Sequence, residues 1–361
     1  MTKYTTLFIL LFIKLPVAAM DYADYHRGIN KAEEFIFVKN KFDSGINLYT
    51  KIFKEFDFVY AGDCLIAMQI ALYVNNEKAF INFTEKAFQN GLMLRNFKKV
   101  YSIKHHSLYL KDTAKFILLY KSNRPHYLAR IDTAALKTMH ALKAEDQLVK
   151  NSIKWPNGQF EFHKERQKRY LPLIEKTIAE LKKIAFEKGF PSDKIVGIDQ
   201  SDIMRELKLN SPDMMEYWWR NKNRNECVIE KGQFQSDEDY LYSYYNIPPI
   251  IHHPKVYDIF DESYYIQQIK LGNIHPKDVA VFHDNTYTNG INTPDVPVGR
   301  CFFGCGVMAE NKANDRKVKD IIINECRAKW FIAPIENDRA KWKFMQEHKM
   351  NYGWGWMGKR S

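Results

Sequence analysis

A glycine and a tyrosine one helical turn apart are the strongest constraint on how this chain folds. In residues 41–56, Gly45 and Tyr49 fall on the same side of a helix, and Ile46 and Phe56 extend that apolar side. The glycine lets a second helix backbone approach closely, and the tyrosine fills the space one turn later. The segment therefore predicts a helix packed tightly against a neighbouring helix.

The same periodicity continues through residues 21–122. Asn75–Glu77 separates two of the expected helices, and Asn90–Gly91 supplies the left-handed residues that end another. Apolar residues recur at three- and four-residue steps in three groups: Ala32, Phe35, Val38 and Phe42; Leu65, Met68 and Leu72; Ala79, Phe83 and Ala87. The pattern indicates a series of antiparallel helical hairpins.

These hairpins resemble a degenerate tetratricopeptide repeat, present in about two copies. The sequence departs from the repeat at Glu33 and Ile52, where the family has small residues. The resemblance implies a non-catalytic scaffold that needs no cofactor and binds a peptide or partner protein on the concave face of the hairpins. The candidate binding residues are Tyr49, Asn82 and Phe83.

Two such hairpins cannot cover their own apolar faces, because each hairpin needs a neighbour. Helical stretches at Tyr109–Tyr120 and His126–Lys150 are expected to cover them, and a further helix is expected to end at Gly189. We therefore predict a mostly all-α fold. Tetratricopeptide-like hairpins over residues 20–122 would pack on a second helical domain over residues 123–361.

Residues 126–340 resemble an uncharacterised bacterial family of helical domains, which has no established activity to transfer. The residues that carry this resemblance are Asp146, Gln147, Gly189, Phe190, Pro191, Val196, Gly197, His252, His253, Gly272, Asp284, Asn324, Glu325, Cys326, Arg327, Ala333, Pro334 and Ile335. A loop-rich insert is expected near residues 286–312.

The first nineteen residues follow the order of a cleavable signal peptide. Lys3 precedes a short apolar run, Pro16 follows the run, and Val17–Ala19 provides the small residues that a signal peptidase prefers. Cleavage after Ala19 is expected, which would place the protein in the periplasm or outside the cell. Translation from Met20 would instead give a cytoplasmic protein. No later segment is apolar for eighteen residues, so no membrane span is expected after the signal.

Two adjacent histidines, His252 and His253, are the most chemically suggestive residues. Pro254 suits the first position of a helix, so one imidazole should lie at the amide end, where the helix dipole favours the neutral ring. Together with Asp284, and with Asp146 if the fold brings it near, these histidines could bind a metal or perform the acid–base steps of a hydrolase. A metal-binding protein or hydrolase-type enzyme is therefore the alternative to a binding scaffold.

A structural role for the same histidines is the other interpretation. Acids in the first turns of a helix also stabilise its dipole, and a histidine beside a proline often packs. If residues 254–271 form one helix and 276–284 the returning one, His253 and His283 would be about 14 Å apart along the axes. Those two histidines could then not share one ion unless the first helix breaks near Asp261.

The composition excludes several other classes of function. The formal net charge is +11, but clusters such as His163–Arg169 carry acids among the bases, and no nucleic-acid motif with interleaved aromatic residues appears, so no nucleic-acid partner is expected. The sequence contains no glycine-rich phosphate loop, no His-Glu-x-x-His motif and no nucleophile elbow. These absences disfavour nucleotide hydrolysis, zinc proteolysis and serine hydrolysis.

Overall fold

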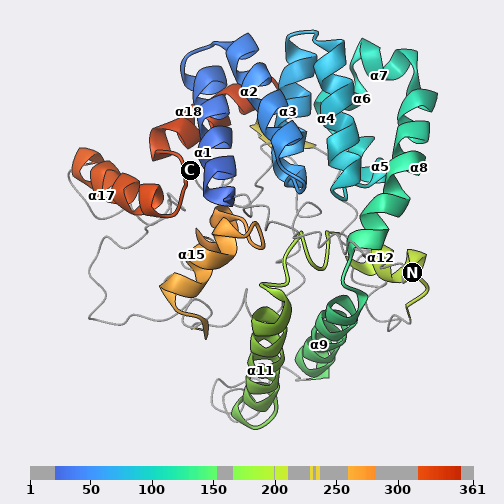
Figure 1. The fold of residues 1–361 in the computed structure, drawn as a ribbon, viewed down its shortest axis with the longest axis vertical. Helices are drawn as coiled ribbons and strands as arrows, with labels where there is room; N and C mark the ends of the chain where they lie inside the picture. Colours follow the sequence, from blue (N-terminus) through green and yellow to red (C-terminus); the bar gives the residue numbers. More distant parts are fainter. Residues whose placement is uncertain are drawn as a thin grey trace, which may run out of the picture.

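The computed structural model describes residues 21–152, 166–198, 200–209, 228–230, 233–235, 259–280 and 316–350, and they are predominantly helical (Figure 1). The N-terminal helices are α1 (Tyr22–Glu33), the π-helical turn η1 (Glu34–Val38), α2 (Phe42–Glu55), α3 (Ala61–Tyr73), α4 (Glu77–Gln89), α5 (Leu94–Phe97), α6 (Tyr101–Lys104), α7 (Ser107–Lys111) and α8 (Thr113–Arg130). The remaining elements are α9 (Thr133–Ser152), η2 (Arg166–Tyr170), α11 (Leu171–Lys188), α12 (Gln200–Glu206), β1 (Val228–Glu230), β2 (Gln233–Gln235), α15 (Glu262–Lys270), α17 (Arg316–Lys329) and α18 (Ile335–Glu347).

The expected all-α class is confirmed. Strands β1 and β2 form one short antiparallel ladder, in which Ile229 pairs with Phe234. Among the described helices, none has both the length and the apolar character needed to cross a bilayer.

Helices α1 to α4 form two antiparallel hairpins that stand side by side, with α8 at one edge of the row and α18 next to α1 at the other (Figure 1). Side chains cap the starts of α1 and α4: the Asp21 carboxylate accepts from the Ala23 N–H at 2.8 Å, and the Asn76 amide oxygen accepts from the Ala79 N–H at 3.0 Å. The predicted break between α3 and α4 at residues 75–77 is confirmed.

Gly45 has the close-packing role that its position predicts. A Cβ added there would lie 2.6 Å from Ile36 Cδ1 and 2.9 Å from the Ala32 carbonyl oxygen, so only glycine lets α2 approach α1 and η1 this closely. One turn later, Tyr49 is completely buried. The core extends through α3, in which every residue from Ala61 to Leu72 is buried.

One expected helix boundary is wrong, because an aspartate begins a new helix inside the expected one. The continuous helix expected over His126–Lys150 is divided after Arg130, since the Asp132 carboxylate accepts from the Ala135 N–H at 2.9 Å and starts α9. Helix α15 also follows an aspartate: it begins at Glu262, so a single helix over residues 254–271 is excluded, and residues 254–258 lie outside the described residues. At the start of α15, the Asp261 carboxylate accepts from the Tyr264 N–H at 2.7 Å.

The boundary expected between residues 122 and 123 falls inside α8. One hydrophobic core contains residues from both sides of that position, including Tyr49 and Phe83 from the hairpins and Ile269 and Trp330 from the C-terminal half. Helices α9 and α11 pack against each other and project below the hairpin row in Figure 1. The residues after α11 thus return to the hairpins, and this return creates the candidate site.

Candidate functional site

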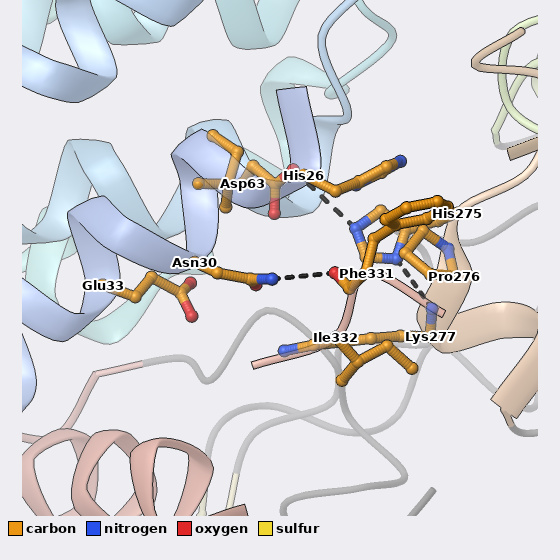
Figure 2. A pocket seen from close by; sticks show the side chains of 10 residues that line it. His26, Asn30, Glu33, Asp63, His275, Pro276, Lys277, Phe331 and Ile332 are labelled. Carbon is orange, nitrogen blue, oxygen red and sulfur yellow. Dashed lines mark hydrogen bonds and ion pairs between the residues drawn. The ribbon is translucent and has the colours of Figure 1, made fainter. Parts of the chain in front are cut away.

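The candidate site is a small pocket where α1 and α3 meet two turns from the C-terminal half of the chain (Figure 2). Its volume is about 10 Å³, which is room for about one water molecule. The polar residues that line it are His26, Asn30, Glu33, Asp63, His275 and Lys277. The pocket therefore concentrates acids and bases from segments far apart in the sequence.

Helix geometry explains how α1 supplies three of these side chains. His26, Asn30 and Glu33 are spaced by four and three residues, so they lie along one side of the helix. The Asn30 amide donates to the Phe331 carbonyl oxygen at 2.7 Å, which fixes the turn before α18 against α1. The turn after α15 is fixed in the same way, because the Tyr60 hydroxyl donates to the Gly272 carbonyl oxygen at 3.0 Å.

Gly272 is required at that second turn for two reasons. Its φ of +71° lies in the left-handed region, and an added Cβ would lie 2.7 Å from the Tyr22 ring. The glycine therefore lets the 271–275 turn approach α1 closely, which carries His275 and Lys277 into the site.

Glu33 and Lys341 form a buried ion pair across the site. The Lys341 ammonium lies 2.5 Å from Glu33 Oε1, and the two side chains are 1% and 5% exposed. The Tyr49 hydroxyl donates to the same carboxylate oxygen at 3.3 Å. Burial lowers the pKa of Lys341, and the Glu33 carboxylate partly opposes that shift.

Asp338 forms ion pairs with two more buried cations, Lys277 and Arg327. The Lys277 ammonium lies 3.3 Å from Asp338 Oδ1, and the Arg327 guanidinium binds Oδ2 while its Nε–H donates to the Ala333 carbonyl oxygen. Burial favours the protonated acid, but the charges of Lys277 and Arg327 outweigh it and lower the pKa of Asp338. Glu33, Lys277, Arg327, Asp338 and Lys341 are called the charge cluster below.

Asp63 lies beside this cluster and differs from its two acids. Its carboxylate accepts from the Tyr25 hydroxyl at 2.7 Å, and the side chain is 2% exposed. Burial, reinforced by the negative charge of Glu33, raises the pKa of Asp63 to about 7. Asp63 is therefore a buried acid that exchanges its proton near neutral pH.

Two neutral histidines complete the site. Burial, together with the neighbouring His26 and Lys277, lowers the pKa of His275 well below its ordinary value, and burial lowers that of His26 to about 3. The Lys277 N–H donates to His275 Nδ1 at 3.0 Å, so the ring proton is on Nε2, 3.9 Å from Asp63 Oδ2. The contact between His275 and Asp63 is thus not an ion pair.

The paired charges and the small volume of the pocket suit a contact that holds distant segments of the chain together. Within the charge cluster, each carboxylate faces at least one cation, and the adjoining pocket has room for about one water molecule. In the part of the chain that the structure describes, no group of three histidine, cysteine, aspartate or glutamate side chains could hold a metal ion. Chemically, the site can exchange a proton at Asp63 and fix α1 to α18.

The residues predicted to bind a partner divide between core and surface. Tyr49 and Phe83 are 0% and 1% exposed and pack against each other with ring centroids 6.2 Å apart, so both serve the core of this structure. Asn82 is exposed on α4. Asp146 lies in α9, but its side chain is outside the described residues. Also outside them are His252, His253, Asp284 and the expected cleavage position Ala19.

Sequence reasoning missed the charge cluster, although it contained one signal. Glu33 occupies a position where the repeat has a small residue, and the structure shows that this carboxylate is buried against Lys341. The two residues are 308 positions apart, and no local pattern relates them. No sequence pattern marks Asp63 as a buried acid, because its burial depends on the C-terminal turns that cover α3.

Comparisons with known proteins add no relative. No protein-family model, curated protein or solved structure matches this chain. The tetratricopeptide-like character of the hairpins and the likeness of residues 126–340 to a bacterial domain family stay predictions.

Proposed function

We propose that this protein is a non-catalytic scaffold that binds a partner protein or peptide on the outer surface of α2 and α4. The observation that carries the proposal is the difference between the two sides of the hairpin pair. One side is covered by the protein's own C-terminal half, and the other presents exposed polar side chains on two adjoining helices.

The covered side is that of α1 and α3. Tyr60 and Asn30 donate to backbone carbonyls of residues 272 and 331, and Glu33 pairs with Lys341 of α18. A groove on this side is therefore occupied by α15, α18 and the turns next to them. This occupation moves the proposed recognition surface away from the concave face that the repeat resemblance implies.

The open side is continuous from α2 to α4. The Phe83 ring contacts Phe53 at a centroid distance of 5.4 Å, so the two helices adjoin beneath this surface. Lys78 and Asn82 are exposed one turn apart on α4. The exposed residues of α2 are Asp43, Ser44, Asn47, Thr50, Lys51, Lys54 and Glu55. Both charge signs are present, which suits a polar partner segment of mixed charge.

A quantitative pull-down with the full chain as bait tests this proposal. Asn82→Arg places a large cation in the middle of the proposed surface and should leave the core intact, because residue 82 is exposed. We expect at least one protein to be captured by the unaltered chain and about tenfold less of it by Asn82→Arg, as for loss of roughly 1.4 kcal/mol of binding free energy.

Lys182→Glu is the matched control, because Lys182 is exposed on α11, away from the hairpins. The control bait should capture the same protein as the unaltered chain. If no captured protein distinguishes Asn82→Arg from Lys182→Glu, the α2–α4 surface is not the recognition site.

A further inference from the structure

The edge of the hairpin row formed by α7 and α8 has a strongly one-sided charge. Residues 94–130 contain nine lysines and arginines and a single acid, Asp112. The carboxylate of Asp112 is engaged as the N-cap of α8, where it accepts from the Lys115 N–H at 3.0 Å. The arginines Arg95 and Arg124 of this region pair with Asp202 and Glu206 of α12, so the lysines of α7 and α8 remain as its exposed charge.

Several lysines elsewhere on the surface are paired with acids. Three examples are the pairs of Lys31 with Glu34 at 2.9 Å, Lys51 with Glu55 at 3.8 Å and Lys176 with Glu145 at 2.7 Å. Among the described residues, no ion pair involves Lys111, Lys115 or Lys121, and all three side chains are exposed. Their charge is available to a partner.

Two exposed leucines lie among these lysines. Leu110 is 62% exposed at the end of α7, and Leu118 is 67% exposed on α8. Lys115, Leu118 and Lys121 are spaced by three residues, so they occupy one side of α8 within an arc of about 120°. The opposite side of the helix packs inward through Phe116. We call Leu110, Lys111, Lys115, Leu118 and Lys121 the basic edge.

We infer that the basic edge binds the surface of an anionic lipid bilayer. Lysine ammonium groups at such a surface reach lipid phosphates while their alkyl stems lie along apolar material, and exposed leucines between them enter the acyl boundary. A polyanion such as a nucleic acid would satisfy the lysines but offer nothing to Leu110 and Leu118. Because α8 is the outermost helix of the row, a flat surface can reach it (Figure 1).

Vesicle flotation of the full chain tests this inference. We expect the chain to bind vesicles of phosphatidylcholine with 30% phosphatidylglycerol and not vesicles of phosphatidylcholine alone. Lys115→Ala with Lys121→Ala should weaken binding by about 25-fold, at roughly fivefold for each lysine near the bilayer. Leu118→Ser should weaken it by roughly tenfold, as for a leucine side chain removed from lipid.

The matched control is Lys182→Ala with Lys183→Ala, which removes two adjacent exposed lysines from α11. It should bind like the unaltered chain, and raising the salt concentration should release all forms. Equal binding to both kinds of vesicle, or an equal effect of the control, would overturn the inference. So would vesicle binding that depends on the lysines but not on Leu118, because the basic edge would then recognise negative charge alone and not the acyl boundary of a bilayer.

Discussion

Asp63 is the residue whose chemistry depends most on the fold around it. Its pKa is raised to about 7 by burial and by the charge of Glu33, whereas an exposed aspartate titrates near 3.9. Between about pH 4 and pH 7, the folded protein therefore keeps a proton on Asp63 that the unfolded chain has already released. By linkage, the stability contributed by Asp63 is present below pH 4 and is lost as the pH rises to 7.

Asp63→Asn removes this titration while keeping an acceptor for the Tyr25 hydroxyl. We expect the free energy of unfolding of the unaltered protein to fall by about 3 kcal/mol relative to Asp63→Asn between pH 5 and pH 8. Urea unfolding at several pH values measures the difference. Asp43→Asn, on the exposed side of α2, is the control. A difference between Asp63→Asn and the unaltered protein that stays constant with pH would contradict the proposed titration.

At this scale, the sequence predicts packing residues better than ionisable ones. Gly45 could be placed at a close helix contact because its role depends on neighbours within a few turns. Tyr49 was expected both to fill the space beside it and to bind a partner, and its complete burial fits the first role. The raised pKa of Asp63 could not be predicted, since the residues that bury it include His275, more than two hundred positions away. Asn82 and Phe83 are neighbours in α4, yet Asn82 is exposed and Phe83 is buried. This difference depends on how α4 is rotated against its neighbours, which the sequence does not show.

At the scale of the elements, the contact of α2 with α1 and η1 depends on the absence of one methyl group. Gly45→Ala gains about 1 kcal/mol of helix propensity but forces a Cβ against Ile36 Cδ1 and the Ala32 carbonyl oxygen. Overpacking of this kind costs about 1–3 kcal/mol, so we expect a net loss of up to about 2 kcal/mol in unfolding free energy.

Thermal and urea unfolding measure this change. Ser44→Ala, an exposed neighbour on the same helix, should leave stability almost unchanged. Ile36→Val in the Gly45→Ala background should recover part of the loss by making room. A Gly45→Ala protein more stable than the unaltered chain would mean that α2 can move away from α1 without cost.

Element boundaries were predictable wherever a single residue type decides them. The breaks at residues 75–77, Gly189 and Gly272 follow from asparagine and glycine conformations that are local. The start of α9 was not predicted, because Asp132 sits inside a longer apolar pattern that favours continuing the helix. Capping by a side chain overrides such a pattern when the preceding segment turns away.

For the whole molecule, the Glu33–Lys341 pair joins the two ends of the described chain. Lys341→Met should destabilise the protein by about 3–5 kcal/mol, because it leaves the Glu33 carboxylate buried without its cation. Lys343→Met is the matched control, since Lys343 is exposed and only 4.0 Å from Glu347 in a surface pair.

Urea unfolding of three proteins separates the ion pair from simple packing. The double change of Glu33→Gln with Lys341→Met removes both charges, so it should recover most of the stability lost by Lys341→Met alone. If Lys341→Met lowers the free energy of unfolding no more than Lys343→Met does, the Glu33–Lys341 pair does not fix α18 to α1.

The separation of Glu33 and Lys341 in the sequence also means that the ribosome makes the two partners of the ion pair at different times. Lys341 follows Glu33 by 308 residues, so at roughly 5–20 residues per second the ribosome adds it about 15–60 s later. Throughout that interval the C-terminal half that covers α1 and α3 is missing, so the Glu33 side of α1 stays open to water. Until α18 is made, a chaperone that shields apolar helices can therefore bind the side of α1 and α3 that the C-terminal half later covers.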